Sequence, residues 1–234
     1  MLNSTFISHF NNKQPPLTSA DLPLTDPSVS VDNILCSEDQ VYELLTSIDT
    51  TTANGHDNIY AIMLKKTALS ITPAVTKLFN VSLTSGELPS EWKTARVSPI
   101  PKSGDNSNPS NYRPISLLSI LSKLLEKHIV NLLTEHLKSH APLSQQQWGF
   151  TKGKSSTGAL LAALDNWHRS LEAGIDICAV FFDYRKAFDS VPHRLLLRKL
   201  RDLKVNSYIL KWITTYLTGS NMSVWMDHHR KYYQ

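Results

Sequence analysis

This 234-residue sequence has only two cysteines and no long apolar run. The scarcity of cysteine argues against a disulfide-rich secreted protein, and the lack of a long apolar run argues against a membrane-spanning one. Cys36 and Cys178 lie far apart and give neither a disulfide framework nor the spacing of a zinc site, which fits a reducing compartment. No apolar stretch approaches the roughly 18 residues that a membrane helix needs. The N-terminal segment MLNSTFISHFNNK lacks the continuous apolar core of a secretory signal. We therefore expect a soluble, intracellular protein with no membrane partner.

The charge of the chain is only mildly positive. The formal net charge is +4 and the isoelectric point is near 9.0, which suits a polyanionic partner but is shared by many unrelated proteins. No concentrated basic run marks a nuclear import signal. With 41% hydrophobic and 19% charged residues, the composition predicts an ordinary globular fold. Nothing in the sequence indicates the oligomeric state.

The first 90 residues predict a polar arm followed by helices. Residues 1–35 are polar, dotted with prolines and without sustained periodicity. Ser37 can cap a short helix whose apolar residues recur at helical spacing. Apolar residues between Ile62 and Leu83 predict two more helical segments, divided near Pro73 and ended by Gly86.

The rest of the chain mixes strands with helices. Ala95–Ile100 predicts a strand, Gly104–Asn111 a polar turn, and the apolar stripe from Ile115 to Leu137 the longest helix. The remaining helices are predicted from caps and periodicity: one capped by Ser155 or Ser156 and running through Trp167, one starting near Asp189 or Ser190 with Pro192 in its first turn, and one over Ser207–Leu217.

One carboxylate follows a predicted buried strand. The run Ile177–Phe182 is typical of a strand covered on both faces, in which Cys178 is expected to be a buried thiol. Asp183 comes directly after it. Carboxylates at such a position hold paired magnesium ions in two-metal phosphoryl transfer. Asp183 alternatively only caps the turn, and spacing alone leaves both open; Asp189 is an expected helix cap.

A second motif looks like a phosphate-binding P-loop. It runs from Gly149 through Gly153 to Lys154 and Ser155. The P-loop needs four residues between its glycines, whereas this segment has three, and a glutamine-rich turn rather than a buried strand precedes it. The sequence therefore disfavours a P-loop nucleotide hydrolase.

Longer segments resemble a single family. FFDYRKAFDSV, from Phe181 onward, closely resembles the first catalytic motif of reverse transcriptases from non-LTR (LINE-like) retrotransposons. ARVSPIPKSGD with NYRPISLLSILSKLLEK resembles the fingers motifs of that family, and QQQWGFTKGKSSTGALLAAL resembles its next block. The segments stand in the family's order, over roughly residues 37–220.

The resemblance implies an α+β fold with the fingers of a right-hand polymerase and a partial ferredoxin-like palm. The implied divisions are a flexible arm (1–35), an N-terminal helical region (36–90), fingers (91–175) and the start of the palm (176–234). The implied activity is RNA-directed DNA polymerisation, which joins a deoxynucleoside triphosphate to a DNA primer on an RNA template with two Mg²⁺ ions. Nuclear action is implied by the family only.

The resemblance also implies roles near the reacting phosphate. Asp183 would be the catalytic carboxylate and a metal ligand. Phe188 would lie against the sugar of the incoming nucleotide, and Tyr184 and Ala187 would offer backbone groups to the metal and the triphosphate. Core packing is the alternative for Phe188.

Further residues would bind the nucleotide and the template. Lys102 and Arg113 would hold the triphosphate, as a point charge and a bidentate fork; each alternatively is a solvated surface charge. The implied wall near template and nucleotide consists of Gln147, Gly149 and Phe150. A nucleic-acid track is the possible role of Trp148, Lys152 and Lys154, with an ordinary structural role for Trp148 left equally open.

The sequence also departs from the family. Relatives usually have Gly-Pro-Asp-Gly-Ile where this chain has Gly55-His56-Asp57-Asn58-Ile59, and Gly219–Asp227 lacks their Arg-x-Gln. The glycine-rich loop and the Ala-Asp-Asp hairpin that supplies the remaining carboxylates are not among these residues. One carboxylate cannot hold two divalent ions against their mutual repulsion, so we predict no polymerisation by this chain alone. The alternative is a non-catalytic nucleic-acid-binding remnant.

Overall fold

The computed structural model describes residues 31–102, 107–108, 111–184, 187–188, 190–218 and 221–224. Most of the expected arm, part of the expected turn at Gly104–Asn111, and Asp189 lie outside these residues. The chain divides into two compact units, residues 1–136 with 188–234 and residues 137–187, and each is described by itself. No helix in the described part is long and apolar enough to cross a membrane.

A capping box starts the first α-helix. A short 3-10 helix, η2 (Asp32–Ile34), precedes α2 (Glu38–Thr46). The Gln40 amide donates to Ser37 Oγ at 3.2 Å, and the Ser37 amide donates to the Gln40 side chain at 3.0 Å. The first of these bonds satisfies an amide that a helix start leaves open, and the second ties the chain before the helix to its first turn. The predicted cap and helix are confirmed.

The next two helices are separated by one residue. α3 (Ala61–Lys66) ends where the amide and the hydroxyl of Thr67 donate to the Met63 carbonyl at 3.0 and 2.8 Å. α4 (Ala68–Ser85) follows at once and contains Pro73, so the predicted break near Pro73 was wrong. Pro73 is the sixth residue of α4, so it removes one backbone hydrogen bond and its ring crowds the carbonyl four residues earlier. The packing of α4 against α2 and a C-terminal helix of the core offsets this cost. Gly86 ends α4 at a φ of 66°, as predicted.

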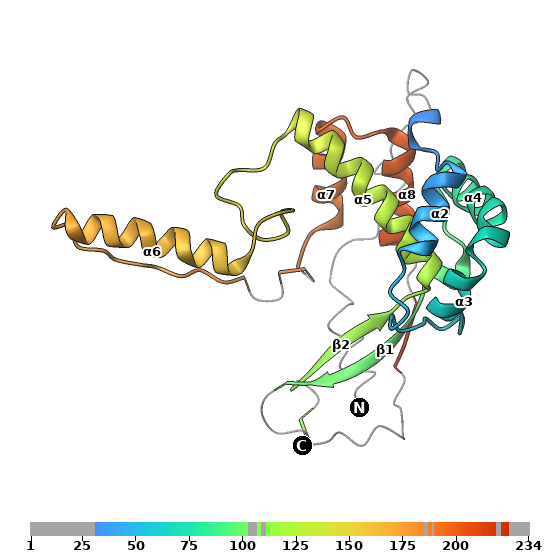
Figure 1. The fold of residues 1–234 in the computed structure, drawn as a ribbon, viewed down its shortest axis with the longest axis horizontal. Helices are drawn as coiled ribbons and strands as arrows, with labels where there is room; N and C mark the ends of the chain where they lie inside the picture. The colour runs from blue at the N-terminus through green and yellow to red at the C-terminus, as the bar shows by residue number, and fades with distance from the viewer. Residues whose placement is uncertain are drawn as a thin grey trace. The chain divides into compact units, whose positions relative to one another are not determined.

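The core of the first unit gathers apolar faces of several helices. α4 packs against both α2 and α8 (Ser207–Leu217), and α7 (His193–Asp202) packs against α8 (Figure 1). α5 (Ile120–His140) contributes Leu125, which is fully buried. Ile34, inside the range expected as arm, is also buried and belongs to this core. The largest fully buried side chains are Phe79, Leu45, Leu83, Ile120, Leu125 and Val41.

A three-stranded sheet extends from this helical core. The 3-10 helix η3 (Ser90–Lys93) leads into β1 (Thr94–Pro101), which pairs antiparallel with β2 (Tyr112–Leu117) and parallel with β3 (Asn221–Val224). The strand order is β2-β1-β3. The predicted strand at Ala95–Ile100 is confirmed.

The long helix begins later than its apolar stripe. A helix from Ile115 was expected, but residues 115–117 belong to β2, where Ile115 lies opposite Ser98. Pairing with β1 satisfies the backbone groups of this segment and overrides its helical spacing. α5 starts only at Ile120 and, with 21 residues, is the longest helix in the described part, as predicted.

The two C-terminal helices test the remaining predictions. α8 has the predicted bounds, and its start is capped by Asn206, whose side chain accepts from the Tyr208 amide at 2.9 Å. α7 begins at His193, later than the expected start near Asp189 or Ser190. Pro192 precedes the helix rather than lying in its first turn, because its ψ of 113° is extended.

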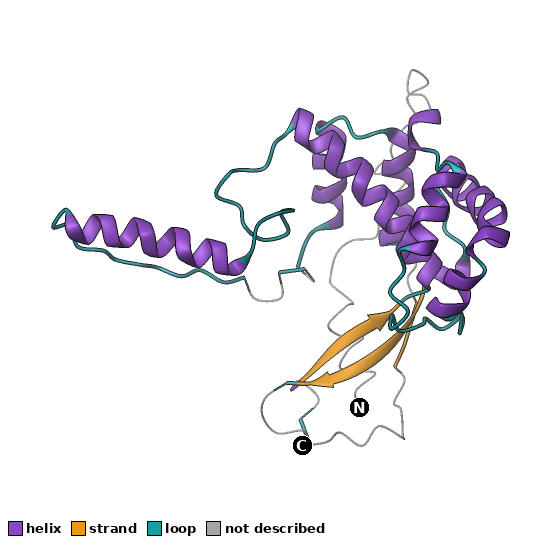
Figure 2. Cartoon of the chain, viewed as in Figure 1, coloured by secondary structure: helices purple, strands orange, loops and turns teal. Residues whose placement is uncertain are grey.

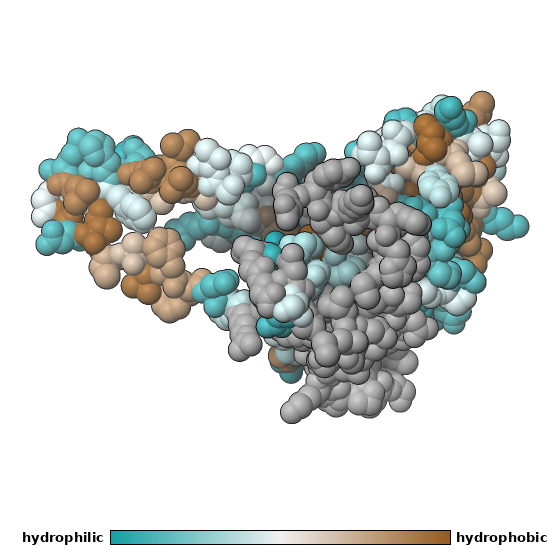
Figure 3. Space-filling model, turned by 90° about the horizontal axis from the view of Figure 1, so that it is seen from below, coloured by the Kyte–Doolittle hydropathy of each residue, from teal (hydrophilic) through white to brown (hydrophobic). Residues whose placement is uncertain are grey.

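The second unit has little core of its own. Its helix α6 (Ser156–Glu172) is capped by Ser155, as predicted, and continues past Trp167. Figure 2 shows α6 as a single unbroken helix. No described residue between 141 and 184 is buried. Leu160, Leu164 and Leu171 are exposed on α6. Figure 3 shows hydrophobic side chains gathered over α6 and the segment that follows it.

The strand expected at Ile177–Phe182 is not formed, so that prediction was wrong. The segment is extended but has no ladder partner among the described residues, whose sheet contains only β1, β2 and β3. Because no strand lies beside this segment among the described residues, its side chains are exposed to solvent. Phe181 is 86% exposed and Phe182 is 89% exposed. Cys178 is exposed rather than buried, for the same reason. The fold as a whole is α+β, as expected.

Candidate nucleotide and template site

Lys102 and Arg113 lie on the same face of the β1–β2 hairpin. The ladder places Ile100 opposite Arg113, and the Lys102 amide donates to the Asn111 carbonyl at 2.6 Å. Opposite and alternate positions of paired strands share a face, so Lys102 and Arg113 are diagonal neighbours with Cα atoms about 7–8 Å apart. Both side chains are exposed. The register therefore brings together two residues that are 11 positions apart in the sequence.

The two faces of this hairpin differ. On one face Ala95 and Val97 are buried, at 5% and 1% exposed. The other face, which carries Lys102 and Arg113, also exposes Ile100 and Ile115, at 38% and 44%. Cations beside apolar side chains suit a ligand that joins phosphates to a base and a sugar.

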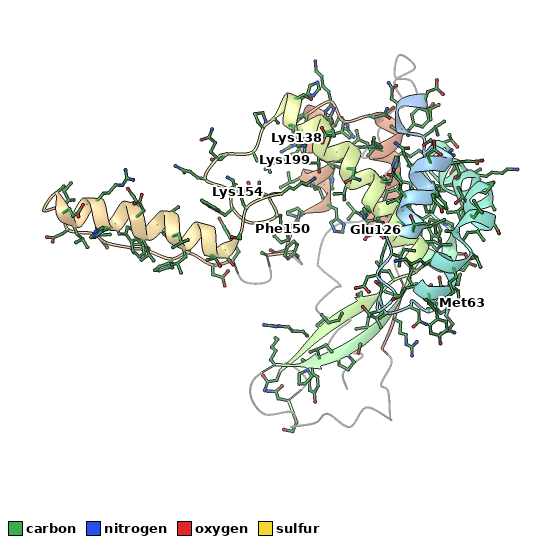
Figure 4. The ribbon with its side chains drawn as sticks, viewed as in Figure 1. Met63, Glu126, Lys138, Phe150, Lys154 and Lys199 are labelled. Atoms are coloured by element: carbon green, nitrogen blue, oxygen red, sulfur yellow. The ribbon has the colours of Figure 1, made fainter. Side chains whose placement is uncertain are left out.

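Gln147, Gly149 and Phe150 share one loop of the second unit. The Gln147 amide donates to the Ser144 carbonyl at 2.9 Å. Phe150 has a φ of 57° and is 93% exposed, so the loop displays an aromatic ring on its surface. Figure 4 labels Phe150 and Lys154 in this loop, before the start of α6. The structure thus brings the three expected wall residues close together.

The geometry of Lys154 argues against a P-loop. Its ammonium donates to the backbone carbonyls of Gln145 and Gln147 and lies 5.2 Å from the centre of the Trp148 ring. A P-loop lysine instead reaches the phosphates of a nucleotide. Ser155 Oγ accepts from the Gly158 amide at 3.0 Å, so it acts as the cap of α6. The sequence interpretation that disfavoured a P-loop is supported.

The residues around Asp183 are exposed. Asp183 and Tyr184 lie in the extended segment after α6, and Tyr184 is 83% exposed. Ala187 and Phe188 are also exposed, Phe188 at 79%. Within the described part of the chain, no group of three or more His, Cys, Asp or Glu side chains could hold a metal ion. Asp183 therefore belongs to no such group in that part of the chain.

A half-buried carboxylate was missed by the sequence analysis. Glu126 on α5, labelled in Figure 4, accepts hydrogen bonds from Ser122 Oγ at 2.9 Å and from the Tyr216 hydroxyl at 3.3 Å. Burial raises the pKa of Glu126 above its ordinary value. The sequence pattern that could have revealed Glu126 is an acidic residue within the apolar stripe of α5, four positions after Ser122.

A basic helix face was also missed. Leu197 of α7 is buried, whereas the opposite side of the helix is charged. The exposed cations on α7 and just after it are Arg194, Arg198, Lys199, Arg201 and Lys204. Asp202 is the one acid in the same stretch. The sequence pattern that could have revealed this face is the mixture of leucines and basic residues in α7. At helical spacing the leucines lie on one side of the helix and the basic residues on the other.

Comparison with known proteins identifies the class. Residues 100–234 match the family described as reverse transcriptase (RNA-dependent DNA polymerase). The match covers more than half of the chain, including Lys102, strand β2 with Arg113, the Gln147 loop and Asp183. The chain belongs to the reverse transcriptase family.

Its relatives come from non-LTR retrotransposons, as the sequence resemblance indicated. The chain is 31% identical over 191 residues to the "Probable RNA-directed DNA polymerase from transposon BS" of Drosophila melanogaster, covering 81% of this chain and 21% of that protein. It is 30% identical over 159 residues to the "Retrovirus-related Pol polyprotein from type-1 retrotransposable element R2" of Popillia japonica, covering 67% and 22%. The chain spans about a fifth of the length of these relatives.

Proposed function

We propose that this chain supplies the nucleotide- and template-binding part of an RNA-directed DNA polymerase. The supporting observation is that Lys102 and Arg113 are diagonal neighbours on one exposed face of the hairpin, in a chain of the reverse transcriptase family. The proposed ligands are a deoxynucleoside triphosphate, an RNA template and a DNA primer. On this proposal residues 91–175 act as fingers and residues 176–234 begin the palm, after the arm (1–35) and the helical region (36–90).

Each proposed residue has a chemical role. Lys102 neutralises a phosphate oxygen as a point charge, and the Arg113 guanidinium binds two oxygens at once. Gln147, Gly149 and Phe150 form a wall against the template and the base. Tyr184 and Ala187 contribute backbone groups, and Phe188 contacts the sugar.

Asp183 is the proposed ligand for Mg²⁺, which would stabilise the charge that develops on the transferred phosphate. The described residues do not fit a complete two-ion centre, because Asp183 belongs to no group of three or more metal-binding side chains among them. No step of the reaction is therefore assigned to a metal on this chain. Location in the nucleus is proposed from the family alone.

Binding of a fluorescent deoxynucleoside triphosphate to the full chain tests the proposal. A lost charge-assisted hydrogen bond costs about 1.5–3 kcal/mol, so Lys102→Gln and Arg113→Gln should each weaken affinity about tenfold to a hundredfold. Arg113→Lys keeps the charge but loses the fork, and we expect an intermediate loss. Lys66→Gln, an exposed lysine of α3, is the matched control. Equal affinity in wild type and both hairpin variants would refute the nucleotide site.

The basic side of α7 favours a second candidate function, binding of a nucleic-acid backbone without catalysis. Successive cations on one helix face suit a line of phosphates, and Arg198 and Lys199 are both exposed. This candidate does not depend on Asp183 or on the hairpin.

Salt dependence of RNA binding tests this candidate. Each lost phosphate contact lowers the slope of log affinity against log salt by about 0.7–0.9, so Arg198→Gln with Lys199→Gln should lower it by about 1–2. Lys66→Gln with Lys77→Gln removes the same charge from α3 and α4 and should leave that part of the slope intact. Equal slopes for the two double variants would rule out α7 as the contact surface.

A further inference from the structure

The loop before α6 is closed by a lysine side chain. Lys154 Nζ donates to the carbonyl of Gln145 and, at 3.1 Å, to the carbonyl of Gln147. The same ammonium lies 5.2 Å from the centre of the Trp148 ring, within range of a cation–π interaction. A single side chain therefore holds the backbone on both sides of Gln146 and the ring that follows.

The start of α6 provides a second anchor for this loop. A Cβ atom at Gly158 would lie 2.7 Å from Cζ3 of Trp148, so the indole packs directly against the first turn of the helix, where only glycine leaves room. Ser155 caps that same turn through its bond with the Gly158 amide. Trp148 thus links the helix start to the lysine that holds the loop.

Two more hydrogen bonds to backbone carbonyls complete the closed arrangement. The Gln147 carbonyl also accepts from Thr151 Oγ1 at 3.2 Å, and the Lys154 amide donates to the Thr151 carbonyl at 3.1 Å. Phe150, between them, is exposed in a left-handed conformation. A residue other than glycine keeps such a conformation only where its surroundings specify it. The contacts of Lys154 are part of those surroundings.

We infer that Lys154 is a positioning residue: it fixes the loop that presents Gln147 and Phe150 and does not itself bind the ligand. This inference rests on the proposed function, because it takes those two residues as the wall for template and nucleotide. A loop that is already ordered loses less conformational freedom on binding, which strengthens binding without any added contact.

Amide hydrogen exchange on the full chain tests whether Lys154 orders the loop. Lys154→Met keeps the aliphatic stem but removes every donor, and we expect exchange in residues 144–155 to become about tenfold faster. Lys154→Arg restores donors and should return exchange close to wild type. Lys152→Met, at an exposed lysine two positions earlier, is the matched control and should leave exchange unchanged. Gly158→Ala should also loosen the loop, because it displaces Trp148 without altering charge. Unchanged exchange in Lys154→Met would overturn the inference.

Affinity for a single-stranded RNA oligonucleotide tests whether the ordered loop strengthens binding. We expect Lys154→Met to bind about tenfold more weakly, Lys154→Arg to recover most of the loss, and Lys66→Met, at an exposed lysine of α3, to stay within about twofold of wild type. If wild type binds and Lys154→Met binds equally despite faster exchange, the positioning role fails and the proposed function stands. If wild type binds neither RNA nor nucleotide, the proposed function fails and the positioning role falls with it, whatever the exchange result.

Discussion

The Tyr216 hydroxyl on α8 donates a 3.3 Å hydrogen bond to Oε2 of Glu126 on α5, and so joins two helices of the core. Ser122 Oγ donates to the other carboxylate oxygen at 2.9 Å. Burial raises the pKa of Glu126, and the bonds from Ser122 and Tyr216 and the charge of Lys123 only partly oppose it. The same burial, with Glu126 nearby, raises the pKa of Tyr216 to about 12.

The raised pKa of Glu126 predicts a pH dependence of stability opposite to that of most carboxyl groups. The folded protein binds a proton at Glu126 more readily than the unfolded chain does. This contribution is therefore complete below the unfolded-state pKa of Glu126 and is lost as pH rises through its higher folded-state pKa. Urea denaturation across that window should show a falling free energy of unfolding in wild type and a flatter curve in Glu126→Gln.

The control for this experiment is Glu43→Gln, which neutralises an exposed glutamate of α2 and should keep the wild-type dependence on pH. A curve for Glu126→Gln that falls as steeply as that of wild type would show that Glu126 is not the group responsible.

A buried hydrogen bond between α8 and α4 gives a second prediction. Trp212 Nε1 donates to Ser82 Oγ at 3.1 Å, and Ser82 in turn donates to the Glu87 carbonyl at 2.6 Å. Ser82→Ala leaves the indole N–H without its acceptor, so we expect a loss of about 1–3 kcal/mol in the free energy of unfolding. In a Trp212→Phe background that donor is gone, and the same substitution should cost less. Additive losses in this double-mutant cycle would show that the bond contributes nothing measurable.

Elements with local signals could be predicted from the sequence. The start of α2 follows from Ser37, whose side-chain cap acts within three residues, and the bounds of α8 follow from its periodicity. Elements with distant partners could not. Residues 115–117 have helical spacing but pair with β1, and Ile177–Phe182 has strand composition but no neighbouring strand among the described residues.

The same division holds for the candidate site. Motif order was enough to select Lys102 and Arg113, but only the register of β1 against β2 places them on one face. From the sequence, Lys154 was interpreted as a possible nucleic-acid contact and as part of a disfavoured P-loop motif. Its bonds to two carbonyls depend on the path of the loop, which no spacing rule specifies. Burial of Glu126 likewise depends on α8, 90 residues later in the chain.

The two cysteines should differ sharply in reactivity. Cys36 is 4% exposed, and burial raises the pKa of its thiol to about 12, whereas Cys178 is exposed. Since the thiolate is the reactive form, a disulfide reagent near pH 8 should titrate one thiol quickly in the native protein and the second only after denaturant is added. Cys178→Ser should abolish the fast phase, and Cys36→Ser should leave it intact. A fast phase that survives Cys178→Ser would show that the core around Cys36 opens readily.

The end of α7 gives a stability prediction of its own. The amides of Lys204 and Val205 donate to the carbonyls of Arg201 and Leu200 at 2.8 and 3.1 Å, which is the Schellman pattern of a helix end. Lys204 occupies its left-handed position, with a φ of 56°, where glycine is favoured. Lys204→Gly should therefore raise the free energy of unfolding by about 0.5–1 kcal/mol, after the extra flexibility of glycine in the unfolded chain is subtracted.

Arg198→Gly is the matched control for the Lys204 variant, because it also replaces an exposed cation by glycine, but within the interior of the same helix. There glycine costs about 1 kcal/mol, so the two variants should move the midpoint of urea unfolding in opposite directions. Lys204→Ala keeps a Cβ atom and removes the charge, and it should stay close to wild type. If Lys204→Ala stabilised the protein as much as Lys204→Gly, relief of charge crowding on the basic side of α7, and not backbone conformation, would be the cause.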